Sequence, residues 1–345
     1  MDLAEARTLF EPDGVYLNTA SYGLPPRPAW DELQDVLHQW RHGTTSWEPW
    51  GEATGRARAA FARLVGVRED DVAEGASVSQ LLGLVAASLP EGARVLAPED
   101  DFTSLLFPFL AQAARGIETR TAPLDRLADA VTPDTDVVAA SLVQSANGAV
   151  LDLDTVEEAA RAGDALVVID ATQACGWLPV DASRVDVLAC HAYKWLCSPR
   201  GTAFMTLGER LRDRVRPDQA NWWAGPDQYG TYYGTPLRLA ETARRLDISP
   251  AWFPWVGTAP AVELLTEVGV EAIHEHDVAL ANRFRAGLGL EPGNSAIVST
   301  DVPGAHEKLE RAGILAAVRA GSLRASFHLY TTEADVDAAL DALVG

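Results

Sequence analysis

The chain has 345 residues, of which 48% are hydrophobic and 22% charged, values typical of a soluble globular protein and not of a disordered or fibrous one. Its formal net charge of −21 works against a nucleic-acid backbone or an anionic membrane surface as partner, so a small-molecule substrate is favoured. No window reaches the roughly 20 apolar residues of a membrane span, no secretion signal is visible and no CxxC pair occurs, so we expect a reduced, cytoplasmic protein.

Two helices are predicted in the first part of the chain, over residues 28–41 and 52–65. In the first of them apolar side chains recur at helical spacing, which predicts one apolar face. We expect this stripe to pack in the core, and it consists of Trp30, Leu33, Leu37 and Trp40.

The middle of the chain alternates short apolar runs with amphipathic patterns, which is typical of an α/β fold. The runs predict buried, mostly parallel strands over residues 93–97, 137–143, 165–169, 185–189 and 203–207. Crossover helices are predicted between them over residues 77–87, 105–114, 153–162 and 208–215.

From about residue 252 the pattern changes, which indicates a second, smaller α+β unit. It predicts helices over 256–268 and 270–288, short strands near 296–299 and 323–328, and a last helix from Glu333. We therefore divide the chain into an N-terminal segment that joins the small domain (1–20), a large domain (21–248) and a small C-terminal domain (249–345). The stretch 219–234 is too aromatic for a plain linker and is expected to cover the site or a subunit interface.

Lys194 is one of only two lysines in the sequence, the other being Lys308. Arginine stays protonated, whereas a desolvated lysine can lose its proton and attack a carbonyl carbon. Lys194 follows a predicted buried strand, which places its amine at the carboxyl edge of the sheet, where open α/β sheets bind ligands. Taken alone, a lysine in this position is more often a surface charge.

Asp170 ends the strongest apolar run, at the same edge of the sheet. A carboxylate there is costly unless it is paired or hydrogen-bonded. A protonated pyridine nitrogen would be such a partner, and pyridoxal 5′-phosphate (PLP) needs one because its ring must stay positive to accept electrons. Asp170 and Lys194 together predict a PLP enzyme with the cofactor held as a Schiff base on Lys194.

The order and spacing of Asp170 and Lys194 resemble those of class V aminotransferases of PLP fold type I, which include cysteine desulfurase-like, carbon–sulfur lyase and isopenicillin N epimerase-like members. The resemblance extends over nearly the whole chain. It implies a mostly parallel seven-stranded sheet sandwiched by helices, in the large PLP-binding domain, and a smaller α+β domain. It also implies a homodimer with sites at the subunit interface, and no residue is assigned to a metal.

Several positions resemble the contacts that this family makes with the cofactor phosphate. Ala76 and Ser77 lie in a loop similar to the family's Gly-Ala-Thr loop, where a helix N-terminus presents N–H groups, although an ordinary helix cap is the alternative. His191 and Tyr193 resemble side-chain donors to the phosphate, although His191 also suits a packing role. Ser249 aligns loosely with a segment that reaches the phosphate of the neighbouring subunit, without the expected Gly-Thr.

Other positions resemble those around the cofactor ring. Phe102 lies where desulfurases of the family carry a histidine over the ring, and it can stack but cannot move a proton. Proton handling is therefore expected from Lys194. Ser145 and Gln173 resemble residues that face the phenolic oxygen of the cofactor.

Two positions resemble substrate contacts. Arg324 matches the arginine of the family's Arg-x-Ser-x-x-x-Tyr-Asn-Thr signature, which implies a bidentate clamp for the α-carboxylate, with a surface ion pair as the alternative. Asn18 lies in a segment similar to one that folds over the substrate. Desulfurases carry a nucleophilic cysteine on a loop just before this arginine, but here residues 318–323 run straight into Arg324. Persulfide formation by that route is not expected.

These observations favour a PLP-dependent carbon–sulfur lyase that acts on a small α-amino acid and eliminates the β-substituent of a cysteine S-conjugate. A class V aminotransferase that makes a 2-oxo acid or aldehyde would use the same residues, and no motif separates the two. A non-catalytic PLP-fold binding protein is the third alternative. The joint presence of Lys194, Asp170 and Arg324 argues against it.

Overall fold

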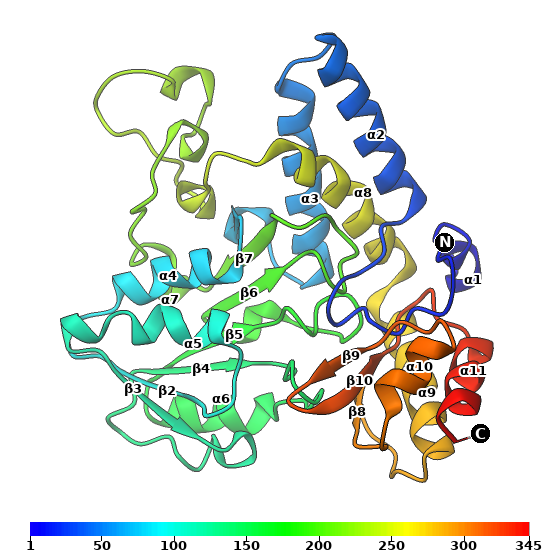
Figure 1. The fold of residues 1–345 in the computed structure, drawn as a ribbon. Coiled ribbons are helices and arrows are strands. Elements are labelled where there is room, and N and C mark those ends of the chain that lie inside the picture. The colour runs from blue at the N-terminus through cyan, green and yellow to red at the C-terminus, as the bar shows by residue number, and fades with distance from the viewer. Residues whose placement is uncertain (345) are drawn as a thin grey trace.

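The structure is a computed structural model that describes residues 1–344, and its centre is a seven-stranded sheet (Figure 1). The strand order is β1-β7-β6-β5-β4-β2-β3, and only β7 runs antiparallel to its neighbours. The strands are β1 (Val72–Gly75), β2 (Arg94–Pro98), β3 (Glu118–Ala122), β4 (Val137–Ser141), β5 (Leu166–Asp170), β6 (Val187–His191) and β7 (Ala203–Leu207). The predicted α/β class with a mostly parallel seven-stranded sheet is confirmed.

Two strands of this sheet were not among the runs found in the sequence. β3 is an edge strand with the sequence Glu-Thr-Arg-Thr-Ala and several exposed side chains, so it contains no apolar run. β1 is four residues long and includes the buried Glu74. The strand predicted over 185–189 begins two residues later, at Val187.

Helices cover the sheet and join its strands, as the crossover pattern predicted. They are α1 (Leu3–Arg7), α2 (Arg27–His42), α3 (Glu48–Leu64), α4 (Val78–Ser88), α5 (Thr103–Leu110), α6 (Leu153–Ala162), α7 (Glu209–Arg212), α8 (Trp252–Val268), α9 (Val270–Gly287), α10 (Ala305–Arg311) and α11 (Glu333–Val344). α5 and α7 are shorter than predicted. In the described part of the chain, no helix combines the length and the apolar character that a membrane crossing requires.

The apolar stripe of α2 is not part of the core, so that prediction is wrong. Trp30 is 53% exposed and Trp40 58% exposed, while Leu33 and Leu37 are only partly buried. α2 lies at the outside of the molecule against α8, where Trp40 contacts Phe253 (Figure 1). Helical periodicity shows that one face is apolar, but it does not show what covers that face.

The C-terminal part of the chain contains a three-stranded antiparallel sheet with the order β8-β10-β9. Its strands are β8 (Ile297–Thr300), β9 (Ala317–Arg319) and β10 (Ser322–Ser326). The N-terminal segment extends this sheet, because Tyr16 bridges Leu315 and Asn18 bridges Ser326. The boundaries proposed at residues 20 and 248 stay predictions.

Candidate active site

A cavity of about 160 Å³ lies at the carboxyl edge of the large sheet. The register explains why polar residues meet there: Ser141 at the end of β4 is level with Asp170 at the end of β5, and Asp170 is level with Ala189 in β6. The cavity lining includes seven residues predicted from the sequence, namely Phe102, Ser145, Asp170, Gln173, His191, Tyr193 and Lys194.

Lys194 is almost completely buried in the cavity wall, with 6% of its surface exposed. Burial lowers the pKa of its ammonium group to about 8, although Asp170 opposes this effect. No hydrogen bond or ion pair joins its Nζ atom to another side chain of residues 1–344. The amine is therefore free to react, and a large fraction of it is neutral near pH 8.

Asp170 is buried, and burial raises the pKa of its carboxyl group to about 6. The Thr172 amide opposes this by donating a hydrogen bond to Oδ1 at 2.8 Å. No cationic side chain of the described residues forms an ion pair with Asp170. A buried carboxylate that lacks a cationic partner fits the protonated ring nitrogen of PLP.

Phe102 is the N-cap residue of α5, and its half-exposed ring lies with its centroid 5.5 Å from Lys194 Nζ. Its position is fixed by Asp101, which the sequence reading did not single out. Asp101 is buried and accepts hydrogen bonds from the Ser141 amide at 2.8 Å and from Gln144 Nε2 at 3.0 Å. The available signal was a carboxylate four residues after the end of the strand predicted over 93–97.

His191 and Tyr193 line the cavity on the side of β6. Burial lowers the pKa of His191 to about 4, with Lys194 contributing, and its Nδ1 atom has no partner among residues 1–344. The Tyr193 ring contacts the Tyr22 ring at 5.2 Å, and the Arg200 guanidinium lies 4.8 Å from it. Arg200 also lines the cavity, and the sequence reading missed it.

Ala76 and Ser77 follow β1 at the same edge of the sheet. Gly75 is level with Ala203, which is level with His191, so the loop lies two strands away from His191. Ser77 Oγ accepts a hydrogen bond from the Gln80 amide at 3.2 Å, so the ordinary helix cap is present. Neither Ala76 nor Ser77 lines the cavity, and their contact with a phosphate stays a prediction.

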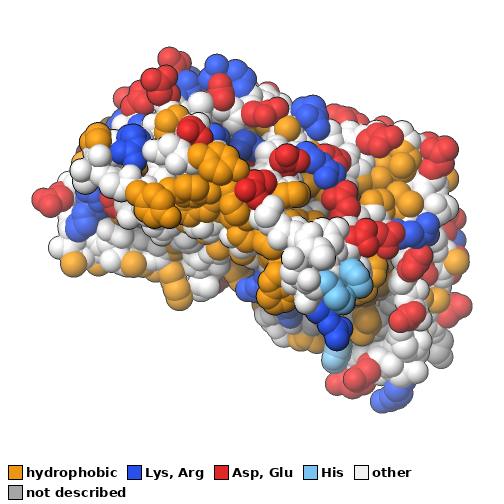
Figure 2. Space-filling model, turned by 90° about the horizontal axis from the view of Figure 1, so that it is seen from above, with side chains coloured by type: hydrophobic (Ala, Val, Ile, Leu, Met, Phe, Trp, Pro, Cys, Tyr) orange, Lys and Arg blue, Asp and Glu red, His pale blue; other side chains and the backbone are white. Residues whose placement is uncertain are grey.

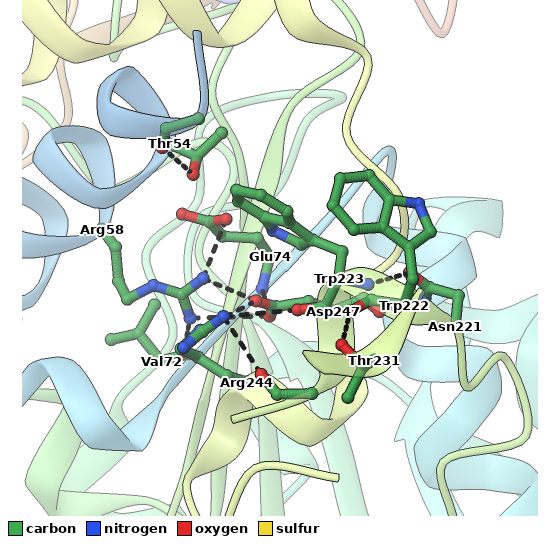
Figure 3. A network of polar contacts seen from close by, with 12 residues as sticks. Thr54, Arg58, Val72, Glu74, Asn221, Trp222, Trp223, Thr231, Arg244 and Asp247 are labelled. Carbon is green, nitrogen blue, oxygen red and sulfur yellow. Dashed lines mark hydrogen bonds and ion pairs between the residues drawn. The ribbon is translucent and has the colours of Figure 1, made fainter. Parts of the chain in front are cut away.

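A buried ionic network holds the end of β1, just before this loop (Figure 3). Arg58 from α3 lies 2.6 Å from Asp247 Oδ2 and 2.8 Å from Glu74 Oε2. The Glu74 amide donates to Asp247 Oδ1 at 2.8 Å, and Arg244 approaches Asp247 at 3.9 Å. Two buried carboxylates share one buried guanidinium. Burial raises the pKa of Glu74 to about 8, the charge of Asp247 contributes, and Arg58 opposes this effect.

Arg324 lies on β10 and is 1% exposed. Its Nη1 atom donates to the Ser145 carbonyl at 2.5 Å and to Ser145 Oγ at 3.2 Å, and its Nη2 atom donates to Ser21 Oγ at 2.8 Å. Burial lowers its pKa to about 10, with Arg319 contributing. No carboxylate of residues 1–344 pairs with it, so a surface ion pair is excluded for this arginine. A buried guanidinium without an anion fits a bound carboxylate.

Gln173 connects this clamp to the cavity floor. Its Nε2 atom donates to Ser145 Oγ at 3.1 Å, and its Oε1 atom accepts from Trp195 Nε1 at 2.8 Å. Ser145, the residue next to Arg324, is therefore held from two sides. This arrangement fixes the distance between the clamp and Lys194.

A second buried pair links the strand of Arg324 to the loop of Lys194. His328 Nδ1 lies 2.9 Å from Asp277 Oδ2 on α9, and His328 Nε2 lies 3.0 Å from the Trp195 carbonyl. Burial lowers the pKa of His328 to about 3 and raises that of Asp277 well above its usual range. Both contacts are satisfied when protonated Asp277 donates to Nδ1 and Nε2–H donates to Trp195.

Asn18, Ser249 and the aromatic stretch also lie outside this cavity. Asn18 pairs with Ser326 through its backbone, and Ser21 is the residue of this segment that reaches Arg324. Ser249 is exposed, and a contact with a neighbouring subunit stays a prediction. The stretch 219–234 does not line the cavity, because its aromatic rings pack around Trp47.

Comparison with known proteins identifies the family of the chain. The model of the aminotransferase class-V family matches residues 52–306. Isopenicillin N epimerase of Streptomyces clavuligerus is 29% identical, with 99% of this chain and 98% of the relative covered. An uncharacterized aminotransferase of Bacillus subtilis, YcbU, is 26% identical, with 94% of this chain and 92% of the relative covered.

Solved structures share the fold. The structure of the cystine C–S lyase C-DES in complex with its reaction product, cysteine persulfide, superposes with a TM-score of 0.86 at 22% identity. The alignment covers 96% of this chain and 97% of that one. The predicted resemblance is confirmed: this chain belongs to the class-V aminotransferase family, a family of PLP-dependent enzymes.

Proposed function

We propose that this PLP enzyme is a carbon–sulfur lyase that acts on cysteine S-conjugates. The observation that carries the proposal is the buried Lys194 amine, which has a lowered pKa and no protein partner among the described residues. Across the cavity lies Phe102, which has no proton to exchange. Lys194 is therefore the group suited to removing the α-proton.

The cavity residues divide the work of holding the cofactor and the substrate. When bound, PLP supplies an electron sink next to the substrate Cα. Lys194 would bond its aldehyde carbon, Asp170 would keep its ring nitrogen protonated, and Phe102 would stack on its ring. Arg324 would hold the substrate α-carboxylate with the help of Ser145.

The cysteines support a lyase and not a desulfurase. Cys175, Cys190 and Cys197 are all buried and free, and none is among the residues that line the cavity. The β9–β10 turn before Arg324 contains no thiol. The solved lyase with the same fold supports this choice as an analogy of fold.

We further propose a cytoplasmic homodimer that uses the exposed aromatic face. Trp30 and Trp40 on α2 are more than half exposed, as are Tyr229, Tyr233 and Leu237. Figure 2 shows hydrophobic side chains gathered in a band on the face seen from above. Apolar patches of this kind mark protein interfaces, and a second copy there would bring Ser249 toward a partner. The free, buried cysteines fit a reducing compartment.

The test compares pyruvate release with amine transfer. The PLP-loaded protein is incubated with S-ethyl-L-cysteine, and pyruvate is measured against transfer of the amino group to a 2-oxo acid. We expect pyruvate from the wild type and none from Lys194→Ala. We also expect an absorption band at about 420 nm that only the wild type forms. Amine transfer without pyruvate would establish the aminotransferase and reject the lyase. A protein that stays colourless with PLP would reject both.

A further inference from the structure

Two arginines lie side by side on the hairpin of β9 and β10. The strands are joined by Ala320 and Gly321, with φ angles of 49° and 88°, the left-handed pair that a tight two-residue turn requires. The register pairs Arg319 with Ser322 and Arg324 with Ala317. Because side chains alternate along a strand, Arg319 and Arg324 are diagonal neighbours on the same face of the hairpin.

One hydroxyl group connects the two guanidinium groups. Ser21 Oγ accepts from Arg324 Nη2 at 2.8 Å and from Arg319 Nη2 at 3.1 Å, so these nitrogens lie within about 6 Å of each other. Within residues 1–344, no acceptor takes the hydrogen of Ser21 and no carboxylate pairs with either arginine. The chain has a net charge of −21, and several other arginines pair with acids, as Arg283 pairs with Asp337. The group thus has two guanidinium groups and no anionic partner among residues 1–344.

The two arginines differ in depth. Arg324 is buried and held by Ser145, beside the reacting centre. Arg319 is exposed, and apart from Ser21 it bonds only the carbonyl of its neighbour Val318, at 2.8 Å. Burial is the main cause of the lowered pKa of Lys194, and the charge of Arg319 contributes to it. Through Ser21, Arg319 is joined to Arg324, whose partner Ser145 lines the cavity.

We propose that Arg319 and the Ser21 hydroxyl bind a second carboxylate at the far end of the substrate side chain, while Arg324 binds the α-carboxylate. The inference rests on the proposed function and specifies its substrate class: a cysteine S-conjugate whose thiol part carries an acidic group. A carboxylate accepts two parallel N–H bonds from a guanidinium and offsets the repulsion between two neighbouring cations. A neutral side chain supplies neither effect.

Binding without turnover gives the first test. Calorimetry on the PLP-loaded protein compares glutarate with pentanoate, two acids of equal chain length that differ in the second carboxylate. We expect wild type to bind glutarate about 10- to 100-fold more tightly. Arg319→Gln should reduce this ratio to within about threefold, and Ser21→Ala should reduce it in part. Arg311→Gln is the control, because Arg311 is exposed on α10 and forms no ion pair in the described chain, and it should keep the full ratio.

Turnover gives the second test, with S-(2-carboxyethyl)-L-cysteine and S-propyl-L-cysteine as a matched pair. We expect kcat/KM to favour the acidic conjugate, and Arg319→Gln to lower kcat/KM for it about 10- to 100-fold more than for the neutral one. Equal binding of glutarate and pentanoate by wild type would overturn the proposal. Equal weakening of both ligands in Arg319→Gln would also overturn it, because Arg319 would then belong to the α-carboxylate clamp. A lack of pyruvate would reject the lyase alone, since the calorimetric result does not depend on turnover.

Discussion

Replacing Glu74 by glutamine is expected to change how the stability of the protein depends on pH. Glu74 and Asp247 are buried and share the guanidinium of Arg58, and burial raises the pKa of Glu74 to about 8. The folded protein therefore holds a proton on Glu74 at pH values where the unfolded chain has lost it. Because the pKa of Glu74 is raised in the folded protein, the contribution of Glu74 to the free energy of unfolding is fully present below the ordinary pKa of glutamate. This contribution is lost as pH rises toward 8.

The size of the effect follows from the shift. Between an ordinary glutamate and a pKa of about 8, the loss in the free energy of unfolding is about 4–5 kcal/mol. Glu74→Gln cannot lose a proton, so its stability relative to wild type should rise by about this amount between pH 4.5 and pH 8.5. Near pH 4.5 the two proteins should differ by less than about 1 kcal/mol, since glutamine resembles the protonated acid.

Urea unfolding of the cofactor-free protein, followed by tryptophan fluorescence at several pH values, measures this difference. Glu307→Gln is the control, because Glu307 is exposed on α10 and forms no ion pair among residues 1–344. Its difference from wild type should not vary with pH. A difference between Glu74→Gln and wild type that stays flat, or that falls as pH rises, would show that Glu74 is ionised in the folded protein and would refute the reasoning.

Three further outcomes are expected. Arg324→Lys keeps the charge but loses the planar guanidinium, so kcat/KM for a cysteine S-conjugate, measured by steady-state kinetics, should fall about 10- to 100-fold. An unchanged kcat/KM would show that Arg324 does not bind the α-carboxylate. Asp277→Asn can still donate to His328 Nδ1 and should cost less than about 1 kcal/mol in urea unfolding, whereas Asp277→Ala should cost about 2–4 kcal/mol; equal losses would contradict a neutral pair. The rate at which the cofactor-free protein captures PLP, followed by absorbance, should rise about tenfold per pH unit below pH 8 and level off above it, because only the neutral amine of Lys194 reacts. The Lys194→Ala variant supplies the baseline. A rate that does not change with pH would count against a lowered pKa of Lys194.

The centre of the fold could be predicted because its signals are local. β4 and β5 are continuous apolar runs, and Asp170 and Lys194 follow strands directly, so their place at the sheet edge follows from the sequence. β1 gave no such signal. Its Glu74 is buried only because Arg58 and Asp247 surround it, and Asp247 lies 173 positions away along the chain.

Ser21 was missed because its contact joins segments that are distant in the sequence. Ser21 is 303 positions from Arg324, and no short motif marks it as the hydroxyl that joins two arginines. Asn18, from the same segment, stays a prediction, and its buried Oδ1 atom has no hydrogen-bond partner among residues 1–344. The prediction for the apolar stripe of α2 failed for a related reason: its period was read correctly, but no distant segment of the described chain covers Trp30 and Trp40.

The contacts of Arg324 also bear on how far the two sheets would move in the proposed reaction. Arg324 belongs to the small sheet, yet it bonds Ser145 beside the large one, and His328 on the same segment reaches the Trp195 carbonyl. Arg324 therefore also holds the small sheet against the large one. In the proposed reaction the substrate would exchange hydrogen-bond partners at Arg324, so we expect the radius of gyration of the protein to change little when substrate binds.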